Sequence, residues 1–441
     1  MNRYDELLQL AESTLFVDTH EHVLEERTRL AGPEGSSRPA QALKDFAVLF
    51  SHYADADLLS AGMPRTDLDG IFSPGLDPRE KWRLLAPWYE RTRLTGYLTN
   101  VRESLRILYG EEDISAENVE RISERVRALI RPGYYRHVLQ EASRVAYCQV
   151  NSLEDPLFME TAQPELLAQD LSLVSLSTDL DTLSAARRAG REVRSLTEWH
   201  GVIDWAFETF GPRAIAVKSQ AAYGRRLDFQ DVSAEEAAPL FARFTADRRS
   251  LSAEEMKALQ DHLFNYCVRK AGEYHLPVKL HTGYYAGTGT MPLHRVRANA
   301  GDVSELLLRY PNVRFVIMHI TWPYQDEAIA LAKHFPNAYV DMCWAWIVNP
   351  SAATRFLEEY LAAAPASKLL TFGGDYMPVE LVPGHARVAR MGLARGLAHL
   401  EQHGQLSPRE TPALLARLMN GNAEEIFDRQ RILSWLKSNA A

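Results

Sequence analysis

The chain has 441 residues, of which 46% are hydrophobic and 24% are charged, so it can bury a large globular core. Its formal net charge of −9, without a block of lysines or arginines, argues against nucleic-acid binding and against binding to anionic membranes. No stretch approaches the roughly 18 unbroken apolar residues that a spanning helix needs. The charged start, residues 1–14, predicts a short amphipathic helix and not a signal peptide.

The three widely spaced cysteines imply neither a disulfide framework nor a cysteine-type zinc site, and a reducing cytoplasm is the simplest compartment.

Short apolar runs alternate with helical patterns along the chain. Most runs are apolar throughout, which is typical of parallel strands covered on the outside by helices. The expected strands are residues 14–20, 144–150, 171–177, 214–220, 276–282, 313–320, 337–344 and 368–375. Strand–helix alternation repeated eight times predicts an α/β fold of the (β/α)8 type, the TIM barrel.

The segments between these strands predict helices. Residues 252–275 open with a capping box formed by Ser252 and Glu255. Two shorter helices are expected at 304–311 and 325–336, each stopped by a proline and followed by a strand.

One gap breaks the alternation, because more than a hundred residues separate the first two strands, where a strand–helix–strand unit needs about 30. The gap contains helical stretches at 78–98 and 115–133, the second with Ser115 as its expected N-cap. We therefore expect one barrel domain over residues 1–441. It should carry a mostly helical insertion at 31–142 over the barrel mouth, a smaller insertion at 224–250 and a helical tail at 385–441 on the barrel outside.

The first expected strand ends in the stretch TLFVDTHEH, residues 14–22. Side chains two apart on a strand point the same way, so Asp18, His20 and His22 should share a face, with Phe16 below them. In a barrel that face is the interior, and the C-terminal end of the strand is the reactive end. Two imidazoles there can bind one metal ion, although such a pair taken alone is more often a surface or core feature.

Four other expected strands also end in chemically reactive side chains. Lys218 ends the fourth, His281 the fifth, His319 the sixth and Asp375 the eighth. Because the C-terminal ends of barrel strands meet at one rim, these side chains should converge with the two histidines of the first strand. Coincidence at five separate strands is a weak explanation, so the sequence predicts a metal-dependent site.

This order of histidine pair, lysine, two histidines and aspartate resembles the metal-dependent amidohydrolase superfamily. The resemblance covers most of the barrel, and its most telling stretches are HTG at 281–283, MHITWPY at 318–324 and GGDYMPVE at 373–380. The chain is most similar to the amidohydrolase-related branch that includes decarboxylases, and to the amidohydrolase-like domain of glutamine-synthetase-like fusion proteins. The long gap after the first strand also resembles uronate isomerases.

The resemblance implies roles for the converging residues. His20, His22, His281 and Asp375 would bind a divalent cation, for which imidazole and carboxylate suit Zn2+, with Mn2+, iron or nickel as alternatives. Asp375 would also accept a proton from the bound water. His319 would bind a second ion in a two-metal enzyme, or would hydrogen-bond the substrate oxygen or the attacking water in a one-metal enzyme.

Lys218 bears on whether one or two ions bind. In two-metal relatives the corresponding lysine is carboxylated and bridges the ions, whereas a protonated lysine cannot act as a ligand. Lys279 lies two residues before His281 and so should face inward one layer deeper. Either lysine could instead neutralise Asp375 or a substrate carboxylate, so the ion count stays open.

Residues after three of the strands are candidates for substrate binding. Tyr223 and Arg225 follow the fourth strand, and an arginine there could hold a substrate carboxylate with two hydrogen bonds or be a solvated loop charge. Tyr284 follows the fifth strand and Trp322 the sixth. Aromatic side chains at this rim could wall a pocket for a flat or apolar group, although aromatic clusters are usually core.

These features predict a cytoplasmic metal-dependent hydrolase that cleaves a C–N bond of amide type in a small substrate bearing a carboxylate. A divalent cation lowers the pKa of bound water from 15.7 to roughly 7 and polarises a carbonyl, and Asp375 would pass the proton to the leaving amine. The alternatives are a decarboxylase or a uronate-type isomerase on the same fold, and a metal-free barrel that only binds or scaffolds. The expected partner is a small-molecule substrate. Relatives often assemble as homo-oligomers, and no interface can be read from the sequence.

Overall fold

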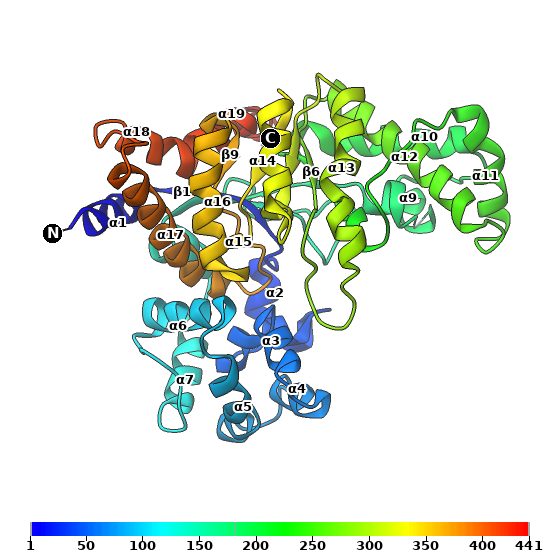
Figure 1. The fold of residues 1–441 in the computed structure, drawn as a ribbon. Helices are drawn as coiled ribbons and strands as arrows, with labels where there is room; N and C mark the ends of the chain where they lie inside the picture. The colour runs from blue at the N-terminus through cyan, green and yellow to red at the C-terminus, as the bar shows by residue number, and fades with distance from the viewer. Residues whose placement is uncertain (1, 181, 440–441) are drawn as a thin grey trace.

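Short parallel strands line the centre of the computed structural model, which describes residues 2–180 and 182–439 (Figure 1). Every strand pairing is parallel, and the long apolar runs between helices supply the buried residues of each strand. The strands are β1 (Phe16–Glu21), β2 (Val145–Val150), β3 (Leu167–Gln169), β4 (Leu171–Ser172), β5 (Val217–Ser219), β6 (Val278–Leu280), β7 (Phe315–Ile317), β8 (Ala338–Asp341) and β9 (Leu369–Leu370).

These strand segments form a closed barrel of eight positions. β3 and β4 are two halves of one strand, because β3 pairs with β2 while β4, one residue further on, pairs with β5. The ring closes between β1 and the chain after β9, where the backbone N–H of Thr19 donates to Phe372 O at 3.0 Å and that of Asp375 donates to His20 O at 2.9 Å. The predicted (β/α)8 barrel is therefore confirmed.

The strands are shorter than the sequence predicts, and two of them show why. The expected strand 171–177 keeps strand geometry only at Leu171–Ser172, and Val174–Thr178 forms a helical turn. The expected strand 313–320 ends at Ile317, because φ turns positive at His319 (61°), Ile320 (49°) and Thr321 (54°). Both segments stay mostly buried after leaving the sheet, so an apolar run does not by itself show where a strand stops.

Helices cover the outside of the barrel. They are α9 (Thr182–Arg188), α10 (Leu196–Phe210), α11 (Ala234–Ala246), α12 (Ala253–Glu273), α13 (Leu293–Arg309), α14 (Gln325–His334), α15 (Ala345–Val348) and α16 (Pro350–Ala363). The predicted capping box of α12 is confirmed: the hydroxyl of Ser252 accepts from Glu255 N at 3.2 Å, and the Glu255 carboxylate accepts from Ser252 N at 2.9 Å. The helix expected at 304–311 begins earlier, at Leu293.

The chain between β1 and β2 is mostly helical and gathers on one side of the barrel, below the strands in Figure 1. Its helices are α2 (Glu26–Ala31), α3 (Ala54–Ser60), α4 (Arg65–Ile71), α5 (Pro78–Thr92), α6 (Gly96–Tyr109), α7 (Val119–Leu129) and α8 (Tyr134–Arg136). The N-cap expected at Ser115 is wrong, since α7 begins after Asn118. The bounds 31–142 for an insertion stay a prediction.

Helices at both ends of the chain meet on the barrel's outer surface. α1 (Arg3–Ser13) contacts α17 (Val382–Gln402), which α18 (Thr411–Ala416), α19 (Asn422–Ile426) and α20 (Arg429–Ser438) follow. Within the predicted tail 385–441, residues 440 and 441 lie outside the described residues. None of the helices in the described part of the chain combines the length and the apolar character needed to span a membrane.

Candidate metal centre

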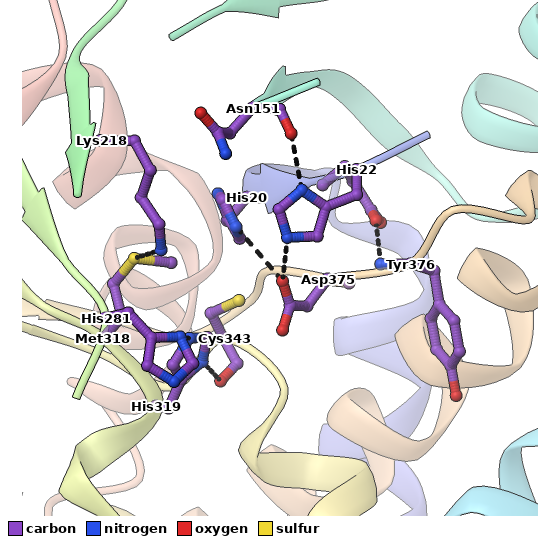
Figure 2. Close-up of polar contacts among 12 residues, drawn as sticks. His20, His22, Asn151, Lys218, His281, Met318, His319, Cys343, Asp375 and Tyr376 are labelled. Carbon is purple, nitrogen blue, oxygen red and sulfur yellow. Dashed lines mark hydrogen bonds and ion pairs between the residues drawn. The ribbon is translucent and has the colours of Figure 1, made fainter. Parts of the chain in front are cut away.

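His20, His22 and Asp375 meet at the C-terminal end of the barrel (Figure 2). The Nε2 atoms of His20 and His22 each lie 3.2 Å from the same oxygen, Asp375 Oδ1. β1 supplies His20, the residue directly after β1 is His22, and the loop after β9 supplies the carboxylate. All three side chains are buried, so three potential ligand atoms face one another away from bulk water.

The surroundings of the two imidazoles leave ring nitrogens available to a cation. His22 Nδ1 lies 2.6 Å from the carbonyl oxygen of Asn151, which can only accept, so Nδ1 carries the proton and Nε2 presents a lone pair to Asp375. His20 is fully buried, and neither of its ring nitrogens has a hydrogen-bond partner. A buried nitrogen without a partner is costly unless another ligand satisfies it.

The electrostatics favour the protonation states that a metal site needs. Burial, aided by the charge of Lys218, lowers the pKa of His20 to about 4, so its imidazole is neutral at pH 7. Burial opposes ionisation of Asp375, but the adjacent imidazoles of His20 and His22 hold the pKa of that carboxyl well below its usual range. Neutral imidazoles and an ionised carboxylate are the forms that bind a divalent cation, so the residues present fit one.

His281 and His319 form a second pair next to this triad. His319 Nδ1 lies 3.1 Å from Cys343 O and His281 Nε2 lies 3.0 Å from Tyr284 O, so each of these nitrogens carries a proton and donates it. The two remaining nitrogens, His281 Nδ1 and His319 Nε2, then face each other at 3.0 Å. In neutral rings both are lone pairs, and burial keeps the rings neutral by lowering the pKa of each, that of His319 to about 3. Two opposed lone pairs fit adjacent ligands of one cation.

The two lysines have different partners. Lys218 is fully buried, and its Nζ lies 2.7 Å from the sulfur of Met318. Burial lowers the pKa of Lys218 to about 8. Lys279 does not neutralise Asp375: its Nζ lies 2.9 Å from both carboxylate oxygens of Asp170, a residue between β3 and β4 that the sequence analysis missed. Asp170 in turn lies 3.9 Å from His20 Nδ1.

Asp18 does not join the imidazoles, contrary to the alternation expected along the first strand. The pairing of β1 with β2 shifts register on both sides of Asp18. Its Oδ1 accepts from the backbone N–H groups of His20 (3.1 Å) and Gly374 (3.3 Å). The carboxyl of Glu21 lies so close to Gly374 that a Cβ there would come within 1.8 Å of it, which accounts for the glycine before Asp375.

A cavity of about 560 Å³ opens beside the triad and reaches His22, His281 and Asp375. Tyr223 and Arg225 line it, as predicted for residues after the fourth strand. The guanidinium of Arg225 is already paired with Asp261 and stacks on Phe229 at 4.3 Å.

Tyr284 and Trp322 lie elsewhere, in a neighbouring hollow of about 410 Å³. Their rings pack against each other at 5.0 Å, and Tyr284 also contacts Trp344 at 5.6 Å. The contribution of Tyr284 to the metal centre is its backbone carbonyl, which accepts from His281.

Two residues of the segment between β1 and β2 lie at the site, and no pattern in the sequence predicts their position there. The hydroxyl of Tyr53 donates to Asp375 Oδ2 at 2.6 Å. Its neighbour His52 lines the cavity and accepts from Met377 N through Nδ1 at 3.3 Å, so its Nε2 carries the proton and can donate to a bound molecule. Burial lowers the pKa of His52 to about 3, which keeps the ring neutral.

Comparison with known proteins agrees with this geometry. The family model described as amidohydrolase matches residues 169–429, more than half of the chain, and this match includes Lys218, His281, His319 and Asp375. The chain therefore belongs to the amidohydrolase family. A curated relative, protein fluG of Emericella nidulans, is 27% identical over 229 residues, 49% of this chain, and the chain spans about a quarter (26%) of that relative's length.

Solved structures share the fold over nearly the whole chain. A uronate isomerase from Thermotoga maritima has a TM-score of 0.77 at 14% identity, covering 96% of this chain and 97% of its own. A glucuronate isomerase from Caulobacter crescentus has a TM-score of 0.73 at 16% identity, and the match covers 96% of this chain and 93% of the isomerase. A Lactobacillus casei protein described as a metal-dependent hydrolase has a TM-score of 0.67 at 17% identity, covering 97% and 98%. At these identities the likeness concerns the fold.

Proposed function

We propose that the protein is a metal-dependent hydrolase that cleaves a C–N bond of amide type in a small, carboxylate-bearing substrate. The observation that carries the proposal is the convergence of two imidazoles and one carboxylate beside a cavity of about 560 Å³ at the reactive end of the barrel. His20, His22 and Asp375 would hold the first cation, and His281 and His319 a second. Zn2+ suits these ligands best, with Mn2+ as an alternative.

The cation would supply a water of low pKa and would polarise the scissile carbonyl. The chain's own contribution is proton transfer and orientation. Asp375 is ionised, and Tyr53 fixes its Oδ2 by a 2.6 Å hydrogen bond, so Asp375 can accept a proton from the attacking water and deliver it to the leaving amine. His52 presents an Nε2–H to the cavity and would orient the substrate.

We infer that Lys218 is carboxylated in the two-ion form of the site. Burial lowers its pKa to about 8, so a substantial fraction of the amine is neutral near pH 8, and a neutral amine is the form that adds CO₂. The addition would form a carbamate with loss of one proton. A carbamate would turn a buried cation into an anionic ligand beside His281 and His319.

Arg225 is the residue of the cavity that would bind the substrate carboxylate. Because its guanidinium is already paired with Asp261, a substrate carboxylate would share it with that aspartate. Lys257 lies 2.7 Å from Asp261 and would balance its charge while Arg225 turns to the substrate.

The second candidate function is a uronate-type isomerase on the same site, and the contact between Tyr53 and Asp375 favours it. A hydroxyl hydrogen-bonded to a carboxylate can relay a proton between neighbouring carbon atoms, a step that isomerisation needs and amide hydrolysis does not.

One assay separates the two reactions. The zinc-loaded protein is incubated with a panel of N-acylated amino acids and, separately, with uronates, and amine release and ketose formation are measured. We expect amine release, abolished in the variant Asp375→Asn. Ketose formation from a uronate without amine release from any amide would overturn the hydrolase in favour of the isomerase.

A further inference from the structure

Cys343, which follows β8, places a thiol inside the metal centre. Its sulfur, a nitrogen of His319 and a carboxylate oxygen of Asp375 lie within 4.8 Å of one another, and all three residues are buried. Figure 2 shows the sulfur directed toward the Asp375 carboxylate. Asp375 thus belongs to two groups of candidate ligands, one with His20 and His22 and one with His319 and Cys343.

The backbone around Cys343 holds the thiol in this position. Its N–H donates to Asp341 Oδ1 at 2.8 Å, and its carbonyl accepts from His319 Nδ1 at 3.1 Å. Gly373 provides the space, because a Cβ at that position would lie 2.8 Å from Cys343 Sγ. The thiol is therefore fitted into the centre between two strand ends.

The other two cysteines of the chain lie outside the two groups of candidate metal ligands. Cys148 and Cys267 are also buried and unpaired, but neither belongs to a cluster of candidate ligands within the part of the chain that the structure describes. Cys267 lies on α12 among apolar core residues. Burial alone therefore does not explain why Cys343 faces His319 and Asp375.

We propose that Cys343 binds the second cation as a thiolate, together with His281, His319 and Asp375. This inference rests on the proposed metal centre and adds a sulfur ligand to it. On binding, one sulfur–metal bond forms and the S–H proton is released to solvent. Sulfur ligation makes this position selective for thiophilic divalent cations such as Zn2+, Co2+ and Cd2+ over Mg2+ and Mn2+.

Cobalt reports sulfur ligation directly, because a thiolate bound to Co2+ gives a charge-transfer absorption in the near ultraviolet that imidazole and carboxylate ligands do not give. The metal-free protein is titrated with Co2+, and bound cobalt and the absorption are followed together. We expect two equivalents of cobalt, with the absorption appearing as the second position fills. In Cys343→Ser the absorption should be lost, and the second equivalent should bind about tenfold more weakly or worse, while the first is retained.

Two further variants keep the test decisive. Cys267→Ser is the matched control and should keep both the absorption and the stoichiometry. The double variant Cys148→Ala/Cys267→Ala retains Cys343 as its only cysteine and should also keep the absorption. This result would identify Cys343 as the sulfur ligand even when Cys343→Ser does not fold. Wild-type protein that binds two equivalents without the absorption would overturn the role of Cys343 and leave the metal centre standing, whereas wild-type protein that binds no cobalt would overturn both.

Discussion

The buried ion pair of Arg29 and Glu380 connects the chain after β1 to the barrel and should contribute measurably to the free energy of unfolding. Arg29 Nε lies 2.7 Å from Glu380 Oε1, its Nη1 donates to Ala42 O at 3.0 Å, and both charged residues have no exposed surface. The hydroxyl of Tyr134 donates to the same Glu380 oxygen at 3.0 Å. Glu380 follows Asp375 by five residues, so its contacts with Arg29 and Tyr134 join both ends of the helical segment to the loop that carries the candidate ligand.

Replacing Arg29 by methionine removes the cation and leaves the carboxylate of Glu380 buried. Breaking a buried ion pair in this way costs about 3–5 kcal/mol, because the remaining charge has neither its partner nor water. The free energy of unfolding, measured by urea denaturation followed by circular dichroism, should fall by that amount in Arg29→Met. The double variant Arg29→Met/Glu380→Leu should recover most of the loss, since neither charge remains.

An exposed pair gives the matched control. Arg65 Nε lies 3.4 Å from Asp69 Oδ1, and both side chains are about 70% exposed (72% and 67%). Arg65→Met should change the free energy of unfolding by less than about 1 kcal/mol. If Arg29→Met costs no more than Arg65→Met, or if the double variant is no more stable than Arg29→Met, the reasoning about the buried pair is refuted.

Three further predictions concern the site and the pH dependence of stability. Tyr53→Phe removes the hydrogen bond to Asp375 Oδ2 and should lower kcat about tenfold to a hundredfold, because a hydrogen bond to a charged group contributes about 1.5–3 kcal/mol. The metal content should not change. An unchanged kcat would exclude the orienting role of Tyr53. Arg225→Met should raise KM for an acidic amide about tenfold, equivalent to 1.4 kcal/mol, and an unaltered KM would remove Arg225 from substrate binding. The hydrogen bond from Arg121 lowers the pKa of Glu111 from 4.5 to about 2, so its contribution to stability is present above pH 4.5 and is lost as the pH falls toward 2. The Glu111→Gln variant should therefore have a lower free energy of unfolding than the wild type at pH 7. Between pH 4.5 and 2 its free energy of unfolding should fall by less than that of the wild type. Parallel curves of unfolding free energy against pH for the two proteins would contradict this.

The barrel could be predicted because each strand is short, parallel and buried on both faces, which leaves continuous apolar runs in the sequence. The rim position of His20, Lys218, His281, His319 and Asp375 followed from the same argument, since each ends such a run. The strand ends near His319 were misplaced because the chain stays buried while its φ angle turns positive.

Other parts of the site could not be predicted from local patterns. Tyr53 meets Asp375 across 322 positions of the chain, and Lys279 meets Asp170 across 109. Neither contact leaves a periodic or spacing signal, so Tyr53 was missed and Lys279 could not be assigned its partner. Cys343 was set aside because three scattered cysteines are too few for a cysteine-type zinc site, and only the fold shows that a single thiol can join imidazoles from other strands.

The most direct test of the metal centre is a crystal structure of the zinc-loaded protein with anomalous scattering recorded across the zinc absorption edge. We predict a zinc peak about 2.0–2.2 Å from His20 Nε2, His22 Nε2 and an oxygen of Asp375. Protein that binds zinc stoichiometrically but shows no peak between these three residues would contradict the account.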